Sequence, residues 1–307
     1  MNVFIQVIEV WKLSRRGAHL ELDAGLYNGL DDFRWHSERT TFEHGQGLPG
    51  QAWAARRPIL LGTNQPEFQR AMTARRADLN TAIAIPIFNG DFLGGVVVLM
   101  CGGSFAGGAI EVWSQVSNDA IALADGYYGT LTSLEQNSRN LQLGWGEGLP
   151  GKAMASHEPV LISPLSTAPG FKRTQAVGEV EVTTGVAMPV THRGKLESAA
   201  VLMSARHTPI ARSFELWRPD AENKTLQIAN AYECTPNFQD TLRKISVRPG
   251  EGVLGHAWVT GCPAVCEDLA KENSRYAHWA CTEGLVSACA IPFSHEGRLR
   301  GIVMLTM

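Results

Sequence analysis

The chain has 307 residues, a formal net charge of -3, and 44% hydrophobic residues. This length indicates two or three domains, because one hydrophobic core usually serves about 100 to 200 residues. The near-balanced charge, without lysine- or arginine-rich runs, argues against nucleic acid as the main partner. The amino end lacks a signal-peptide pattern, and the longest apolar stretch, residues 92–100, is about half the length of a membrane helix. We therefore expect a cytoplasmic protein without membrane contact.

Four features recur in the same order three times along the chain, at a spacing of about 100 residues. An opening strand that ends in tryptophan covers residues 8–11, 110–113 and 214–217. A glycine turn, Gly-x-Gly-Leu-Pro-Gly in its first two copies, covers residues 45–50, 146–151 and 250–255. A short strand after a predicted helix covers residues 58–61, 159–162 and 263–266. A strand with the pattern Ala-x-Pro begins at residues 84, 187 and 290, and a hairpin follows it.

The repeats predict three units, residues 1–103, 104–206 and 207–307, joined by short linkers at residues 101–108 and 204–212. Each unit reads as strand, strand, glycine turn, helix, strand, helix, strand, hairpin, strand. Antiparallel neighbours joined by tight turns, with short helices on one face, make an α+β unit. The recurring tryptophans at positions 11, 113 and 217 are expected to pack in the cores.

At these residues the sequence resembles the GAF domain family, in the variant with Gly-x-Gly-Leu-Pro-Gly before a helix and Ala-x-Pro-Ile before the last hairpin. The resemblance covers essentially the whole chain, three times. It implies five- or six-stranded antiparallel sheets with a small-molecule pocket on one face, in a family that mostly regulates other activities. The glycine turn is interpreted first as a fold element. Its backbone N–H groups at a helix start also leave an anion site open as an alternative.

The sequence departs from the family at its ends. GAF domains usually begin and end with long helices that cover the back of the sheet, whereas here strands start within a few residues of Met1 and the chain ends in a strand at Met307. The closing strands are nearly continuous apolar runs, typical of a sheet that is covered on both faces. We therefore expect that the three sheets pack back to back, exchange strands, or bury these faces in an oligomer.

The resemblance alone does not select a ligand, since GAF domains bind cyclic nucleotides, bilins, haem, metals or amino acids. The Cys-His pair of bilin-binding members is absent from residues 68–78, 171–180 and 274–284. The asparagine-lysine signature of cyclic-nucleotide-binding members has only a poor match at residues 223–224, without the acidic pair that follows. The cofactor therefore stays unassigned.

The family position of the pocket lies between the sheet and the helix that follows each glycine turn. Aromatic walls with a few polar groups are the usual form of a small-ligand site. The expected ligand-binding residues in unit 1 are Trp53, Phe68 and Asn80, with Ile85 beside them. Those in unit 3 are Trp258, Tyr276, His278 and Cys281. Trp53 and Trp258 are interpreted first as core residues, with a place in the pocket wall as the alternative.

Five of the six cysteines lie in the last third of the chain. Cys262 and Cys266, with Cys281, Cys289, His256 and His278, could supply zinc or iron ligands. However, Cys-x-x-x-Cys partly along a strand separates its two side chains, and unmodified buried thiols are the expected outcome, with no metal. One GAF group reduces free methionine sulfoxide, and Cys281 resembles the position of its catalytic cysteine. Leu254 stands where that group has a second cysteine in the glycine turn.

We therefore expect a non-catalytic sensory or regulatory protein of signal transduction that binds a small molecule or a partner protein, or associates with itself. The first alternative is a protein-interaction scaffold whose pockets are filled by side chains. The second is a thiol-based methionine-sulfoxide-type reductase that uses unit 3.

Overall fold

The computed structural model describes residues 3–102, 107–179, 182–192, 195–205, 208–220, 222, 224–233 and 238–307. Unit 1 contains β1 (Ile5–Leu13), β2 (His19–Leu26), α1 (Asp31–Ser37), β3 (Thr41–Glu43), α2 (Gly47–Ala55), β4 (Ile59–Gly62), α3 (Ala71–Arg76), β5 (Leu79–Asn89) and β6 (Phe92–Gly102). Its six strands form one antiparallel sheet in the order β3-β2-β1-β6-β5-β4. Compared with the predicted pattern, the structure adds a short helix, α1, and a short strand, β3, before the glycine turn.

Units 2 and 3 repeat this sheet. Unit 2 contains β7 (Gly108–Gln115), β8 (Ala120–Tyr127), α4 (Thr132–Arg139), β9 (Gln142–Gly144), α5 (Gly148–Ser156), β10 (Val160–Ile162), η1 (Leu165–Thr167), α6 (Thr174–Glu179), β11 (Val182–His192) and β12 (Lys195–Ala205). Unit 3 contains β13 (Ser213–Asp220), β14 (Thr225–Glu233), α7 (Phe238–Leu242), β15 (Ser246–Val247), α8 (Gly252–Thr260), β16 (Ala264–Cys266), η2 (Leu269–Lys271), α9 (Arg275–Thr282), β17 (Ala288–His295) and β18 (Arg298–Thr306). The three strand orders are equivalent, which confirms the α+β repeat. The domain boundaries near residues 103 and 206 fall outside the described residues and stay a prediction.

The glycine turns are needed for the fold. The first glycine of each turn has a positive φ, and its backbone N–H donates to the carbonyl of the last one, as from Gly45 to Gly50. A Cβ on that last glycine would lie 2.1 Å from the Glu43 carbonyl oxygen in unit 1. The matching distances are 2.5 Å at Gly151 and 2.4 Å at Gly255. No side chain fits there without moving the backbone, which explains the repeated glycine.

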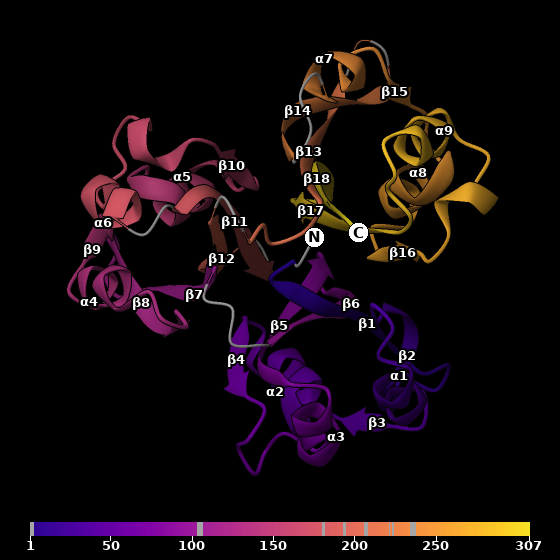
Figure 1. The fold of residues 1–307 in the computed structure, drawn as a ribbon, viewed down its shortest axis with the longest axis horizontal. Helices are drawn as coiled ribbons and strands as arrows, with labels where there is room; N and C mark the ends of the chain where they lie inside the picture. The colour runs from indigo at the N-terminus through magenta and orange to yellow at the C-terminus, as the bar shows by residue number, and fades with distance from the viewer. Residues whose placement is uncertain are drawn as a thin grey trace.

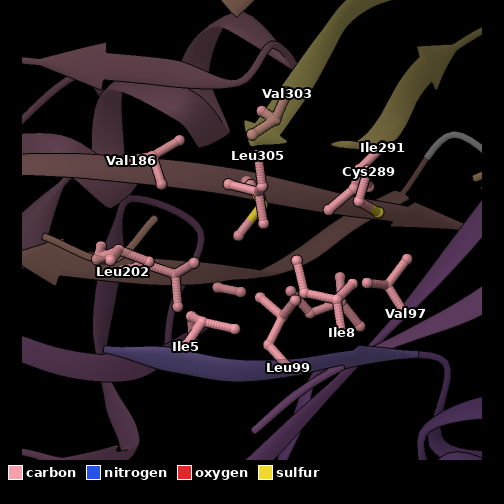
Figure 2. Close-up of a cluster of buried hydrophobic side chains, with 14 of the residues drawn as sticks. Ile5, Ile8, Val97, Leu99, Val186, Leu202, Cys289, Ile291, Val303 and Leu305 are labelled. Carbon is pink, nitrogen blue, oxygen red and sulfur yellow. The ribbon is translucent and has the colours of Figure 1, made fainter. Parts of the chain in front are cut away.

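The backs of the three sheets share one hydrophobic core. Figure 1 shows the sheets around a common centre with the helices on the outside, and β5, β11 and β17 contact one another there. Figure 2 shows side chains from all three units in this core; its labelled residues are Ile5, Ile8, Val97, Leu99, Val186, Leu202, Cys289, Ile291, Val303 and Leu305. Back-to-back packing thus covers the apolar faces that long helices would otherwise cover.

The other face of each sheet packs against the helices of its own unit in a separate core. Trp11, Trp113 and Trp217 lie at the equivalent place in these three cores and are fully buried. No helix in the described part of the chain has the length and apolar character that a membrane span requires. Each unit therefore has two buried sheet faces, one private and one shared.

Candidate functional site

A buried glutamate recurs at the same position of the first strand in each unit. Glu9, Glu111 and Glu215 are at most 1% exposed and point into the private core of their unit. The indole of the tryptophan two residues later donates a hydrogen bond to each carboxylate, at 3.0, 2.8 and 2.7 Å. Burying a carboxylate costs folding free energy unless hydrogen bonds or a cation satisfy it. The residues around each glutamate therefore show what stabilises it in each unit.

In unit 1 the partner of the glutamate is an arginine. The guanidinium of Arg70 donates to both carboxylate oxygens of Glu9, with one contact at 2.8 Å, and is itself only 6% exposed. Arg70 also donates to the hydroxyl of Ser37 on α1, and the hydroxyl of Tyr27 donates to Glu9 at 3.1 Å. Residues from β1, from α1, from the position after β2 and from the position before α3 therefore close one polar network between sheet and helices.

Unit 2 repeats this network with equivalent residues. Arg173 donates to both carboxylate oxygens of Glu111 and to the hydroxyl of Ser138. Tyr128 and Ser138 donate to the same carboxylate at 2.8 and 3.0 Å. Burial alone would raise the pKa of Glu111, but the charge and hydrogen bonds of Arg173 outweigh burial and lower it. The ion pair is therefore charged when the unit is folded.

Unit 3 differs at the position of the arginine. Arg70, Arg173 and Tyr276 each lie 14 residues before the alanine of the Ala-x-Pro strand, so Tyr276 replaces the cation. The hydroxyl of Tyr276 donates to Glu215 at 2.8 Å, and Ser213 donates at 2.9 Å. Burial raises the pKa of Glu215 to about 7, although these bonds and that from Trp217 lower it in part. Among the described residues no lysine or arginine bonds this carboxylate.

These networks occupy the place between sheet and helices where the family resemblance puts a small-molecule pocket. By contrast, three clefts that the structure describes lie between units or at the hairpin tips. One of about 420 Å³ lies between units 1 and 3, and one of about 910 Å³ lies between units 1 and 2. A third, of about 640 Å³, is lined by hairpin residues of all three units. Open space for a partner is therefore found at the contacts between units.

The predicted site residues of unit 1 do not form one group. Phe68 is buried in the private core beside Arg70, and Trp53 is half-buried on α2 with an edge contact to His44. Asn80 is exposed at the start of β5, near Tyr127 of unit 2. Ile85 points to the opposite face of the sheet, into the shared core. Of these residues, only Phe68 contacts the glutamate network.

In unit 3, Tyr276 is part of the Glu215 network and Trp258 is half-buried against the private core. His278 and Cys281 lie on the same helix, α9, but are exposed. The structure therefore brings Tyr276 inside and leaves the other two outside, because the helix turns them to its solvent face. Ligand binding by any of these residues stays a prediction.

The sequence analysis did not predict the glutamate networks. The signal was present: a glutamate interrupts an otherwise apolar strand in all three copies, followed two residues later by tryptophan. A charged residue that recurs inside a buried strand requires a partner, and arginine recurs at one position in units 1 and 2. The sequence does not show, however, that each glutamate contacts the arginine 61 or 62 residues further along the chain.

The four described thiols of unit 3 belong to Cys262, Cys266, Cys281 and Cys289. No group of three or more His, Cys, Asp or Glu side chains able to hold a metal occurs in the portion that the structure describes. Burial is the main cause that raises the pKa of Cys266 to about 11, and burial also raises the pKa of Cys262. Cys281 is exposed and unbonded to another cysteine. These environments oppose formation of a thiolate at Cys262 and Cys266.

Comparison with known proteins agrees with this architecture. Residues 201–306 match the family model of the GAF domain. This match covers nearly all of the third unit. Units 1 and 2 repeat its strand order, so the chain consists of three GAF-like units in tandem. A search of curated proteins found no matching relative.

Several solved structures are similar to about one third of the chain. They include a Staphylococcus aureus NreA protein mutated in its nitrate-binding site, with 15% identity, 33% of this chain and 77% of that one covered, and a TM-score of 0.28. The free methionine-R-sulfoxide reductase of Neisseria meningitidis has 21% identity, coverage of 31% and 52%, and a TM-score of 0.26. The nlh2 GAF domain of A. aeolicus has 16% identity, coverage of 32% and 57%, and a TM-score of 0.26. The chain thus spans little more than half of the latter two proteins.

Proposed function

We propose that this chain is a non-catalytic regulatory protein that binds a partner protein, with its three units acting as one rigid body. GAF domains are generally sensory or regulatory modules that bind small molecules or proteins. We choose a protein partner because side chains fill the space between sheet and helices in units 1 and 2. Glu9–Arg70 and Glu111–Arg173 occupy the family's ligand position with side chains that satisfy one another.

Native mass spectrometry of the purified chain, compared with its denatured mass, tests this proposal. We expect a clean mass of the chain alone or of a defined oligomer, because the interior positions of units 1 and 2 already hold side chains. A retained small molecule would contradict the proposal and would favour the alternative of a small-molecule sensor. In that case unit 3 is the first place to look, since Glu215 lacks the arginine of the other units.

A thiol reductase remains the second alternative, and it depends on Cys281. The raised pKa of Cys266 and the exposure of Cys281 outside the Glu215 network speak against it. We expect the wild type and Cys281→Ser to reduce methionine sulfoxide or peroxide at the same background rate. Turnover by the wild type that disappears in Cys281→Ser would establish the reductase and reject the non-catalytic proposal.

A further inference from the structure

The three contacts between neighbouring units are built from equivalent elements but are not equally closed. In each, the short strand after the glycine-turn helix faces the first two strands of the next unit. β16 contacts β2, and β10 contacts β13. The third strand, β4, faces β7 and β8 across the cleft of about 910 Å³, and Figure 1 places β4 on the side of unit 1 that faces β7. Three residues of unit 2 at this contact differ from both of their counterparts in the other units.

The first difference is a serine in place of a glycine. The tryptophan of the first strand pairs with a residue of the last strand in each unit, and the residue before that partner is compared here. It is Gly95 in unit 1 and Gly301 in unit 3, but Ser198 in unit 2. A Cβ on Gly95 would lie 3.5 Å from Pro263, and a Cβ on Gly301 would lie 3.1 Å from Pro159. The corresponding proline of unit 1, Pro58, lines the cleft, and Ser198 is buried. Unit 2 thus carries a side chain at a place where the other two units have none.

The second difference removes an ion pair across the contact. Between units 2 and 3, Arg218 bonds Glu158 at 3.1 Å. The equivalent positions at the cleft hold Ser114 and Arg57, which both line it. A serine side chain is too short and carries no charge for Arg57, so no bridge draws β4 toward β7.

The third difference concerns the backbone edge of the strand. Asn230 donates through its side-chain amide to the carbonyl oxygen of Leu161 on β10 at 2.9 Å. Leu60 has the place of Leu161 on β4, and Asp125 has the place of Asn230. The side chains of Asp125 and Asn230 each accept a hydrogen bond from the backbone N–H of the following residue. Unlike the amide of Asn230, however, the carboxylate of Asp125 has no proton to donate to the Leu60 carbonyl. At this place the opposite wall of the cleft therefore presents a carboxylate to the edge of β4, where the contact between units 2 and 3 has an amide donor.

From these three differences we propose that the cleft between units 1 and 2 binds an extended peptide of a partner protein, added as a strand to the free edge of β4. This rests on the proposed function and names its site. β4 is the last strand of its sheet, and the Asn230–Leu161 bond demonstrates that the equivalent backbone position accepts an amide donor. Leu60, Ile59 and Val116 supply apolar contacts, and Asp125 selects a basic side chain on the peptide.

A surface-displayed library of random nine-residue peptides, selected on the whole chain, is the probe. The closed variant Ser114→Glu with Asp125→Asn restores an ion pair with Arg57 and an amide donor for Leu60. The matched control, Gln136→Glu with Asp240→Asn, changes charge equally on exposed faces of α4 and α7, away from the cleft. We expect enriched peptides with lysine or arginine that bind the closed variant at least about tenfold more weakly than wild type or control.

Amide hydrogen exchange with a selected peptide locates the site. The peptide is expected to protect the amide of Leu60, and N-methylation of its central backbone nitrogens is expected to abolish binding. Absence of enriched peptides, equal binding to the closed variant, or protection elsewhere would overturn the proposal. A concentration-dependent dimer that protects β4 would assign the cleft to a second copy and would overturn it too. These failures leave the non-catalytic proposal standing, whereas a retained small molecule or thiol turnover would refute that proposal without testing the cleft.

Discussion

Units 1 and 2 pair their buried glutamate with an arginine, whereas unit 3 surrounds Glu215 with hydroxyl and indole donors. The three carboxylates lie at one position of one fold and are equally buried, so only their neighbours differ. An arginine lowers the pKa of Glu111, while Tyr276 at the same position leaves the pKa of Glu215 at about 7. One side-chain replacement therefore changes the charge that the core of a unit holds near neutral pH.

The largest expected effect follows from removing one arginine. Arg70→Met leaves the carboxylate of Glu9 buried without its cation, and such a loss typically costs about 3–5 kcal/mol of unfolding free energy. Urea denaturation followed by tryptophan fluorescence measures it. Arg75→Met, an exposed change on α3, the helix that follows Arg70, is the control. Because the cost comes from the uncompensated charge, Glu9→Gln combined with Arg70→Met should recover part of the loss; a single-variant loss below about 1 kcal/mol would contradict the network.

The next effect is a pH dependence of opposite sign in units 2 and 3. Glu215 binds its proton more tightly when folded, with a pKa of about 7 against an ordinary 4.5. Its contribution is fully present below pH 4.5 and is lost as the pH rises to about 7, a change of about 3 kcal/mol. Glu111 has a lowered pKa, so its contribution is present above the ordinary pKa and is lost as the pH falls.

Urea unfolding at a series of pH values, with Glu215→Gln and Glu111→Gln, separates the two contributions. The stability of wild type relative to Glu215→Gln should fall between pH 5 and pH 7, since the amide cannot ionise. Wild type relative to Glu111→Gln should instead lose stability only toward acid pH. Parallel curves for wild type and Glu215→Gln would show that the pKa of Glu215 is not raised.

A smaller effect is expected from Tyr276→Phe, which removes one hydrogen bond from Glu215 and keeps the ring. A buried acceptor that loses its donor typically costs about 1–3 kcal/mol. The same change should raise the pKa of Glu215 further, because the Tyr276 hydrogen bond lowers it. Carbon-13 NMR titration of the glutamate carboxyls measures this shift, with Tyr232→Phe as a control at the shared core. An unchanged carboxyl titration would mean that Tyr276 does not act on Glu215.

The contrast between units also marks what could be predicted from the sequence. Most of the elements along each unit, the glycine turns and the burial of the closing strands follow from local patterns, since periodicity and turn residues act over a few positions. The pairing of Glu9 with Arg70 depends on how β1 and the start of α3 meet in space, which local patterns do not contain. For the same reason, Asn80 and Ile85 were expected beside Phe68, while the register of β5 turns Ile85 to the shared core.

The contacts between units were beyond local prediction for a different reason. The sequence allowed back-to-back packing, strand exchange or an oligomer, because an apolar face specifies burial without specifying its partner. The choice depends on all three sheets fitting one core, as Figure 2 shows. Comparing the repeats position by position then becomes informative: Ser114, Asp125 and Ser198 each differ from both of their counterparts, at the contact that contains the cleft of about 910 Å³.

The smallest expected effect comes from an ion pair at the surface, between units 1 and 3. Arg34 donates to both carboxylate oxygens of Glu267 at 2.9 and 3.1 Å, a geometry much like that of Arg70 with Glu9. However, the two side chains are 41% and 46% exposed, and exposed pairs contribute about 0.2–1 kcal/mol. Arg34→Gln should therefore lower the unfolding free energy by less than about 1 kcal/mol, and 1 M salt should remove the difference. A loss as large as that of Arg70→Met would mean that position between units, and not burial of the charge, determines what these arginines contribute.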